Sequence, residues 1–242
     1  MIARAVIAVA ALSLTLFLAG PAAAERRGYS VTGFDRIQIH GPFVVRLTTG
    51  SGSSAYAEGD NRAINEISVE VMGSTLRVRR NLSTSWGGYS GEREAQTAIL
   101  YLTTHELEQA TVIGTGDLEI DRMEGGRLLL SLGGNGRLAV SEIEADHVAM
   151  AVTGAGVMEI GGHAETGRVT VQGPGTVSAS GLVIENLTVN LNGPGSIEVA
   201  AEREADVTSV GNGVVTVLGD AACTDRSVGS GQVSCGGFLS RR

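Results

Sequence analysis

Residues 150–160 read Met-Ala-Val-Thr-Gly-Ala-Gly-Val-Met-Glu-Ile, two alternating apolar segments joined by a Gly-Ala-Gly tripeptide. Hydrophobic side chains occupy every second position, at Met150 and Val152 before the glycines and at Met158 and Ile160 after them. Strict alternation of this kind is typical of β-strands with one buried face. The segment therefore predicts two short strands that meet at a glycine corner.

The same arrangement recurs through the second half of the chain, with Gly-x-Gly tripeptides spaced 18 to 20 residues apart. They begin at Gly114, Gly134, Gly154, Gly173, Gly193, Gly211 and Gly229. One such unit cannot bury its apolar face alone, whereas stacked units can. A calcium-binding nonapeptide roll would need about half this period and a propeller about twice as many residues per blade. We therefore predict an all-β fold, a right-handed parallel β-helix with coils of about 18–20 residues and Gly-x-Gly corners.

Stacking the coils in register predicts inward-facing columns of hydrophobic side chains. The column before the corners contains Val112, Leu132, Val152, Val171 and Leu191. The column after the corners contains Ile120, Val140, Ile160 and Val199. A third column contains Leu128, Val148 and Leu187. This register places Val152 between Leu132 and Val171 in neighbouring coils.

The N-terminus has the features of a secretory signal peptide. Arg4 supplies a positive charge, an uncharged and mostly apolar run follows at residues 5–18, and three alanines at residues 22–24 form a small-residue cleavage site. The run is shorter than the roughly 20 apolar residues of a spanning helix, which favours cleavage after Ala24 over an N-terminal anchor. We therefore predict a signal peptide at 1–24 and export to a bacterial periplasm or cell surface.

The predicted mature chain, residues 25–242, is interpreted as one β-helical domain without a transmembrane segment. Its regular coils cover 110–235, and the preceding residues 29–110 are more diverged. Within that diverged part, two alternating segments at 67–71 and 76–79 flank Met-Gly-Ser and predict a hairpin.

Several motifs of the N-terminal part resemble a known family. Residues 31–37 read Val-Thr-Gly-Phe-Asp-Arg-Ile, residues 44–47 Val-Val-Arg-Leu, residues 57–61 Ala-Glu-Gly-Asp-Asn and residues 76–78 Leu-Arg-Val. Followed by the Gly-x-Gly coils, they resemble the autotransporter-adhesin head GIN domain family over roughly 29–235. The resemblance implies a single exported bacterial β-helical domain without an assigned activity.

The composition and the motifs argue against several kinds of chemistry. A net charge of −8 with only 4% aromatic residues is unfavourable for nucleic-acid binding, which needs clustered cations. Glu119, Glu159 and Glu198 share one outward column on alternate coils, about 9.6 Å apart, and we interpret them as a solvated face. The four histidines, His40, His105, His147 and His163, have no metal-ligand spacing. The sequence therefore predicts no catalytic residue, no cofactor and no metal site.

Two functional interpretations remain open. The first is a non-enzymatic scaffold or adhesin-like module whose partner is an envelope protein or a glycan. The second is a carbohydrate-binding or carbohydrate-active β-helix protein. Trp86 and Tyr89 lie in a polar loop at 81–97, which is either an interaction loop or a cover for one end or edge of the solenoid.

The two cysteines, Cys223 and Cys235, both belong to the final coil. Cys223 continues the column of Leu128, and Cys235 continues the column of Ile120, so both should point inward on strands that flank one corner. An even number of cysteines in an exported chain favours a disulfide. The alternative is two free thiols that serve as small apolar residues.

Overall fold

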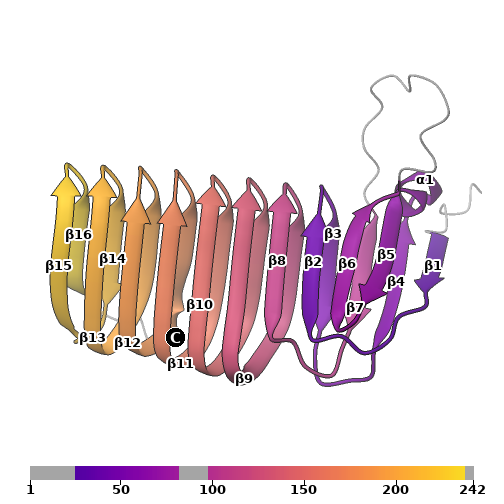
Figure 1. Ribbon diagram of the computed structural model, residues 1–242, viewed down its shortest axis with the longest axis horizontal. Coiled ribbons are helices and arrows are strands. Elements are labelled where there is room, and N and C mark those ends of the chain that lie inside the picture. The colour runs from indigo at the N-terminus through magenta and orange to yellow at the C-terminus, as the bar shows by residue number, and fades with distance from the viewer. Residues whose placement is uncertain (1–24, 82–97, 238–242) are drawn as a thin grey trace, which may run out of the picture.

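The computed structural model describes residues 25–81 and 98–237. Of these residues 75% lie in strands and 3% in a helix, and parallel strands stack into a β-solenoid of about six turns. Figure 1 shows the stacked coils as one elongated body, with the C-terminal strands at one end and β1 at the other. The predicted all-β parallel β-helix is confirmed.

Each regular coil is one long, curved strand that begins after one Gly-x-Gly corner and ends at the next. These strands are β9 (Asp117–Gly134), β10 (Arg137–Gly154), β11 (Val157–Gln172), β12 (Thr176–Asn192) and β13 (Ser196–Gly211). They pair in parallel and in chain order. The sequence predicted two short strands per coil. In the structure the bend is accommodated by register shifts such as that between Val140 and Ile143, and the pairing between neighbouring strands continues on both sides of it.

The two glycines of each corner are required for different reasons. The first adopts positive φ, as at Gly154 with φ 109°, a region that side chains other than glycine rarely occupy. The second stacks closely on the corner of the preceding coil, and a Cβ at Gly136 would lie 2.4 Å from the Gly116 carbonyl oxygen. The repeat therefore retains both glycines because of backbone conformation and backbone contact.

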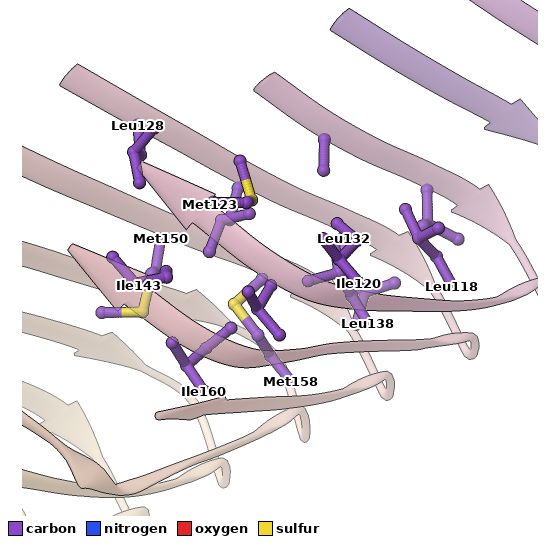
Figure 2. Close-up of a cluster of buried hydrophobic side chains, with 14 of the residues drawn as sticks. Leu118, Ile120, Met123, Leu128, Leu132, Leu138, Ile143, Met150, Met158 and Ile160 are labelled. Atoms are coloured by element: carbon purple, nitrogen blue, oxygen red, sulfur yellow. The ribbon is translucent and has the colours of Figure 1, made fainter. Parts of the chain in front are cut away.

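The predicted columns form the hydrophobic core. Val152 is 1% exposed and pairs with Leu132 on one side and Val171 on the other, as expected. A further buried column, absent from the sequence analysis, contains Met123 and Ile143, which pair with each other on adjacent coils. Figure 2 shows these side chains packed with the predicted columns inside the coils.

The N-terminal coils stack in an order that differs from the chain order. Strands β2 (Arg36–His40) and β3 (Val44–Thr48) form a coil that pairs with β8 (Gln109–Gly114) and β9 on one side. On its other side β2 and β3 pair with β6 (Thr75–Arg80) and β7 (Ile99–Thr103). The coil formed by β2 and β3 is thus inserted between segments that follow it in sequence.

Antiparallel strands close the N-terminal end. The predicted hairpin is confirmed as β5 (Ile67–Met72) with β6, and β1 (Glu25–Tyr29) and β4 (Ser54–Gly59) extend the other face next to β7. The short helix α1 (Asn61–Asn65) connects β4 to β5 and buries Ile64 in the core. These elements cover the edge that the first parallel coil would otherwise expose.

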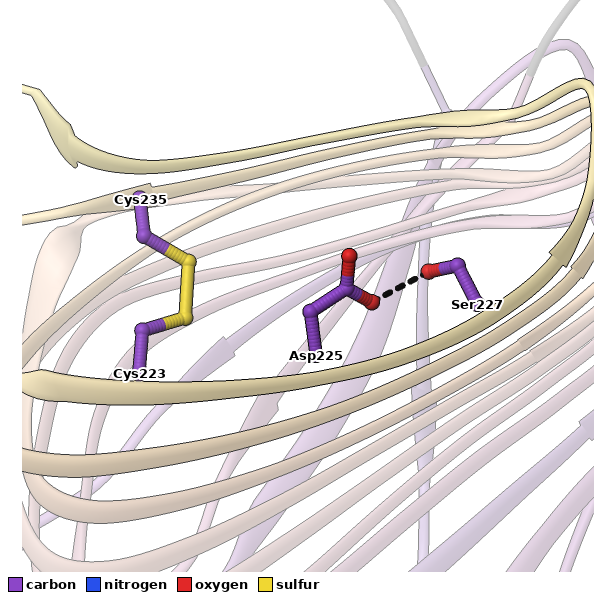
Figure 3. The surroundings of a disulfide bond; sticks show 4 residues. All are labelled: Cys223, Asp225, Ser227 and Cys235. Carbon is purple, nitrogen blue, oxygen red and sulfur yellow. Dashed lines mark hydrogen bonds between the residues drawn. A yellow bond between two sulfur atoms is a disulfide. The ribbon is translucent and has the colours of Figure 1, made fainter.

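The C-terminal end is closed differently, by a divided coil and a disulfide. Strands β14 (Val214–Leu218) and β15 (Ala222–Gly229) pair with successive parts of β13, and β16 (Gln232–Gly237) pairs with β14. Cys223 lies beside Ala205 and Cys235 beside Val217, in the predicted columns. The predicted disulfide joins them across the coil, with Cα atoms 6.4 Å apart (Figure 3).

Candidate functional site

The glutamate column predicted on the outer face lies in register, and two of its three members take part in ion pairs; Glu198 has no cationic partner within the described ranges. Glu119 lies 3.0 Å from the Arg46 guanidinium, and Glu159 is paired with Arg137. Asp117 lies between the two arginines, 3.7 Å from Arg46 and 3.5 Å from Arg137. These contacts form a ladder of alternating charge along the solenoid.

The electrostatics of this ladder favour a structural role. Partial burial acts to lower the pKa of Arg137, but its hydrogen bond to Glu159 and the nearby carboxylates raise that pKa above its usual value. Glu119 and Glu159 both face arginines, so this outer face holds these two carboxylates in ion pairs.

The other sequence-predicted candidates are dispersed. His40, His105, His147 and His163 are all exposed. Across 25–81 and 98–237, no group of three or more His, Cys, Asp or Glu side chains is placed to hold a metal ion. Trp86 and Tyr89, predicted as an interaction loop, lie outside the described residues.

A lateral groove, which the sequence analysis did not identify, crosses five coils. It has a volume of about 430 Å³. It lies on the outside of the coils above the third hydrophobic column, that of Leu128, Val148 and Leu187, where β9 to β13 run side by side. Two outward columns line it, one running from Arg127 to Glu204 and the other from Leu129 to Asp206. Its volume falls within the range of ligand-binding clefts.

The charges of the groove are unevenly distributed. Arg127 lies at its N-terminal end and Arg168 on its central coil, and neither has an ion-pair partner among the described residues, whereas nine of the 14 arginines in those residues do. At the opposite end, Asp206 lies 3.3 Å from Arg226, outside the groove lining, and Glu204 has no cationic partner within the described ranges. The groove therefore offers two available cations, followed by an acidic end.

Hydrogen bonds arrange the polar groups between these charges. The Thr166 hydroxyl donates to the Asp146 carbonyl at 2.9 Å, so it accepts a hydrogen bond from Nδ1 of His147. This pairing engages Nδ1 and leaves Nε2 without a hydrogen-bond partner among the described residues. The Asn186 amide donates to the Glu165 carbonyl at 3.5 Å, which leaves its Oδ1 available as an acceptor.

Solved structures share this architecture at low sequence identity. A putative adhesin from Bacteroides fragilis superposes with a TM-score of 0.76 at 19% identity, with 88% of this chain and 96% of that chain covered. A putative lipid binding protein from Parabacteroides distasonis gives 0.69 at 18% identity, covering 89% and 98%. A putative adhesin from the same species gives 0.67 at 20% identity, covering 89% and 98%. At these identities the likeness shows the fold.

Two further comparisons concern the sequence, and one finding concerns the helices. Among curated proteins, none matches the sequence. Within the described part of the chain, no helix has the length and hydropathy needed to span a membrane. The model of a protein family matches residues 33–221, well over half of the chain. The chain accordingly belongs to the family described as "putative auto-transporter adhesin, head GIN domain", as its N-terminal motifs predicted.

Proposed function

We propose that this protein is an exported, non-enzymatic recognition module of the bacterial cell envelope. The observation that carries the proposal is the lateral groove, which presents unpaired arginines and free acceptors along a rigid stack of coils. The outer face next to the corners also favours binding over bond cleavage, because two of its glutamates, Glu119 and Glu159, are engaged by arginines. The family and two of the structural neighbours named above are described as adhesins rather than enzymes, which is consistent with this role.

Two features support export. The disulfide between Cys223 and Cys235 suits an oxidising compartment. Residues 1–24 have the signal-peptide pattern, with three alanines at 22–24 as the expected cleavage site. The proposal thus places the mature chain, residues 25–242, in the periplasm or at the cell surface as a single domain.

Processing can be tested directly. The full-length chain is expressed in a bacterium, recovered from the periplasmic and extracellular fractions, and its intact mass measured. The proposal expects a mature chain that begins at Glu25. Recovery of the protein in the cytoplasm with Met1 retained would contradict export.

Recognition is tested with the folded, disulfide-bonded protein and envelope fragments from its native host. The labelled protein should bind these fragments saturably, and excess unlabelled protein should displace it. A heat-unfolded and alkylated sample serves as the control for non-specific adhesion. Binding that does not saturate, or that the unfolded sample reproduces, would contradict the proposed function.

A further inference from the structure

We propose that the lateral groove between β9 and β13 binds an acidic oligosaccharide, with Arg127 and Arg168 holding its anionic groups. This inference rests on the proposed recognition function and names the ligand class of that surface. It differs from the Trp86 loop suggested by the sequence, because every group it uses lies within the described coils.

Arg127 and Arg168 differ from most other arginines of the described residues. The chain carries 26 acidic side chains against 18 basic ones, and nine of the 14 arginines in the described residues are engaged by carboxylates. Arg127 and Arg168 instead line a groove without an ion-pair partner in the described residues. A guanidinium that is free of intramolecular partners is well suited to a bidentate contact with a carboxylate, sulfate or phosphate group.

The two arginines are offset in two directions. Arg127 pairs with His147 and Ala149 pairs with Arg168, so the two arginines lie two coils apart along the solenoid and two positions apart along the strands. Two strand spacings correspond to about 9.6 Å along the axis, and two residues to about 7 Å along a strand. A linear polymer that crosses the groove obliquely could therefore present two of its anionic groups to both arginines at once.

Polar groups lie between the charges of the groove. Asn186 offers Oδ1 as an acceptor, His147 adds a ring nitrogen, and the Thr188 hydroxyl lines the groove beside them. Hydrogen-bonding groups interspersed with cations suit a ligand that combines hydroxyl and anionic groups. An acidic sugar chain has this combination.

The backbone argues against an extended peptide as the ligand. Strands β10, β11 and β12 each pair with a neighbouring strand on both sides. Their backbone N–H and C=O groups are therefore already hydrogen-bonded within the sheet. Peptide recognition by strand addition needs a free sheet edge. Recognition in this groove must instead use side chains, which here are mostly polar.

The test uses the full mature chain and fluorescently labelled oligogalacturonate as the carboxylated probe. A heparin-derived oligosaccharide is the sulfated probe, and dextran oligomers are the neutral control. We expect saturable binding of at least one acidic probe, no binding of dextran, and a loss of about tenfold or more in affinity in the variant Arg127→Gln/Arg168→Gln. Arg62→Gln removes another exposed arginine without an ion-pair partner, at the N-terminal end of the solenoid, and should leave the affinity unchanged.

Several outcomes would overturn the inference. These are absence of binding to both acidic probes, equal binding by the double-arginine variant, and binding of dextran as strong as that of the acidic probes. Binding to vesicles that contain anionic phospholipid, without binding to either acidic sugar, would assign the groove to a membrane surface instead. If the double variant still binds envelope fragments saturably, the ligand class is wrong while the proposed recognition function stands.

Discussion

Asp225 lies directly beside Val207 in the parallel register of β15 on β13. A carboxylate thus occupies a column that the preceding coils fill with Met150, Val169, Val189 and Val207. Figure 3 shows Asp225 hydrogen-bonded to Ser227, both projecting from the same side of β15 as Cys223. The final coil therefore ends the hydrophobic core with polar groups, which discourages another coil from stacking on the open edge.

Replacing that carboxylate should promote association between molecules. In Asp225→Val the terminal layer becomes apolar, so two solenoids can pack end to end without burying an unpaired charge. Sedimentation velocity over a range of concentrations should show association that increases relative to the wild type. Thr224→Val alters the neighbouring exposed position and should not produce this increase, and equal association in both variants would count against the capping role.

The inside-outside assignment predicts very unequal effects at two positions of one coil. Val152→Asp places a charge between Leu132 and Val171 and should lower the free energy of unfolding by several kcal/mol. Glu159→Ala removes a half-exposed ion pair with Arg137 and should change it by about 1 kcal/mol or less. Urea denaturation provides the comparison, and equal stability of the two variants would refute the register.

The close stacking of corners predicts that glycines in one coil differ in their tolerance of a methyl group. Gly136→Ala would place its Cβ 2.4 Å from the Gly116 carbonyl oxygen, and separating them should destabilise the protein by roughly 1–3 kcal/mol. Gly126→Ala is the matched control, because its nearest contact is the Asp146 carboxylate at 3.4 Å. Thermal unfolding should show a lower melting temperature for Gly136→Ala only; similar melting temperatures would contradict the stacked-corner geometry.

The disulfide predicts a redox-dependent stability of the terminal coil. Cys223 and Cys235 are separated by 12 positions in the sequence, and opening so short a loop should cost about 2–3 kcal/mol. Hydrogen exchange of β15 and β16 should increase on reduction, while that of β10 and β11 stays protected. Alkylation of the protein purified without reductant should modify neither cysteine, and two modified thiols would exclude the disulfide.

The regular coils could be predicted from the sequence because the pattern that specifies each coil lies within about 20 consecutive residues. Alternation on both sides of each glycine corner identifies the inward side chains, and the constant period then fixes the register. Val152 between Leu132 and Val171 follows from these two facts. The disulfide could be predicted in the same way, because Cys223 and Cys235 both continue columns of inward-facing side chains.

Features that depend on non-local pairing could not be predicted in this way. Met123 and Ile143 were missed because two consecutive exposed residues precede each of them at the bend and interrupt the alternation. The insertion of β2 and β3 between later segments depends on pairing across long sequence separations. The groove was missed because Arg127 and Arg168 belong to different columns two coils apart, and their proximity appears only once the coils are stacked.

The central claim, recognition through the lateral groove, is tested most directly by site-specific photo-crosslinking to envelope fragments. A photoreactive residue replaces Thr188, which lines the groove, or Thr216, which lies on β14 outside the groove lining. We expect a discrete crosslinked product from position 188, lost on competition with unlabelled protein, and little or none from position 216. Equal crosslinking from both positions, or crosslinking from position 216 alone, would contradict it.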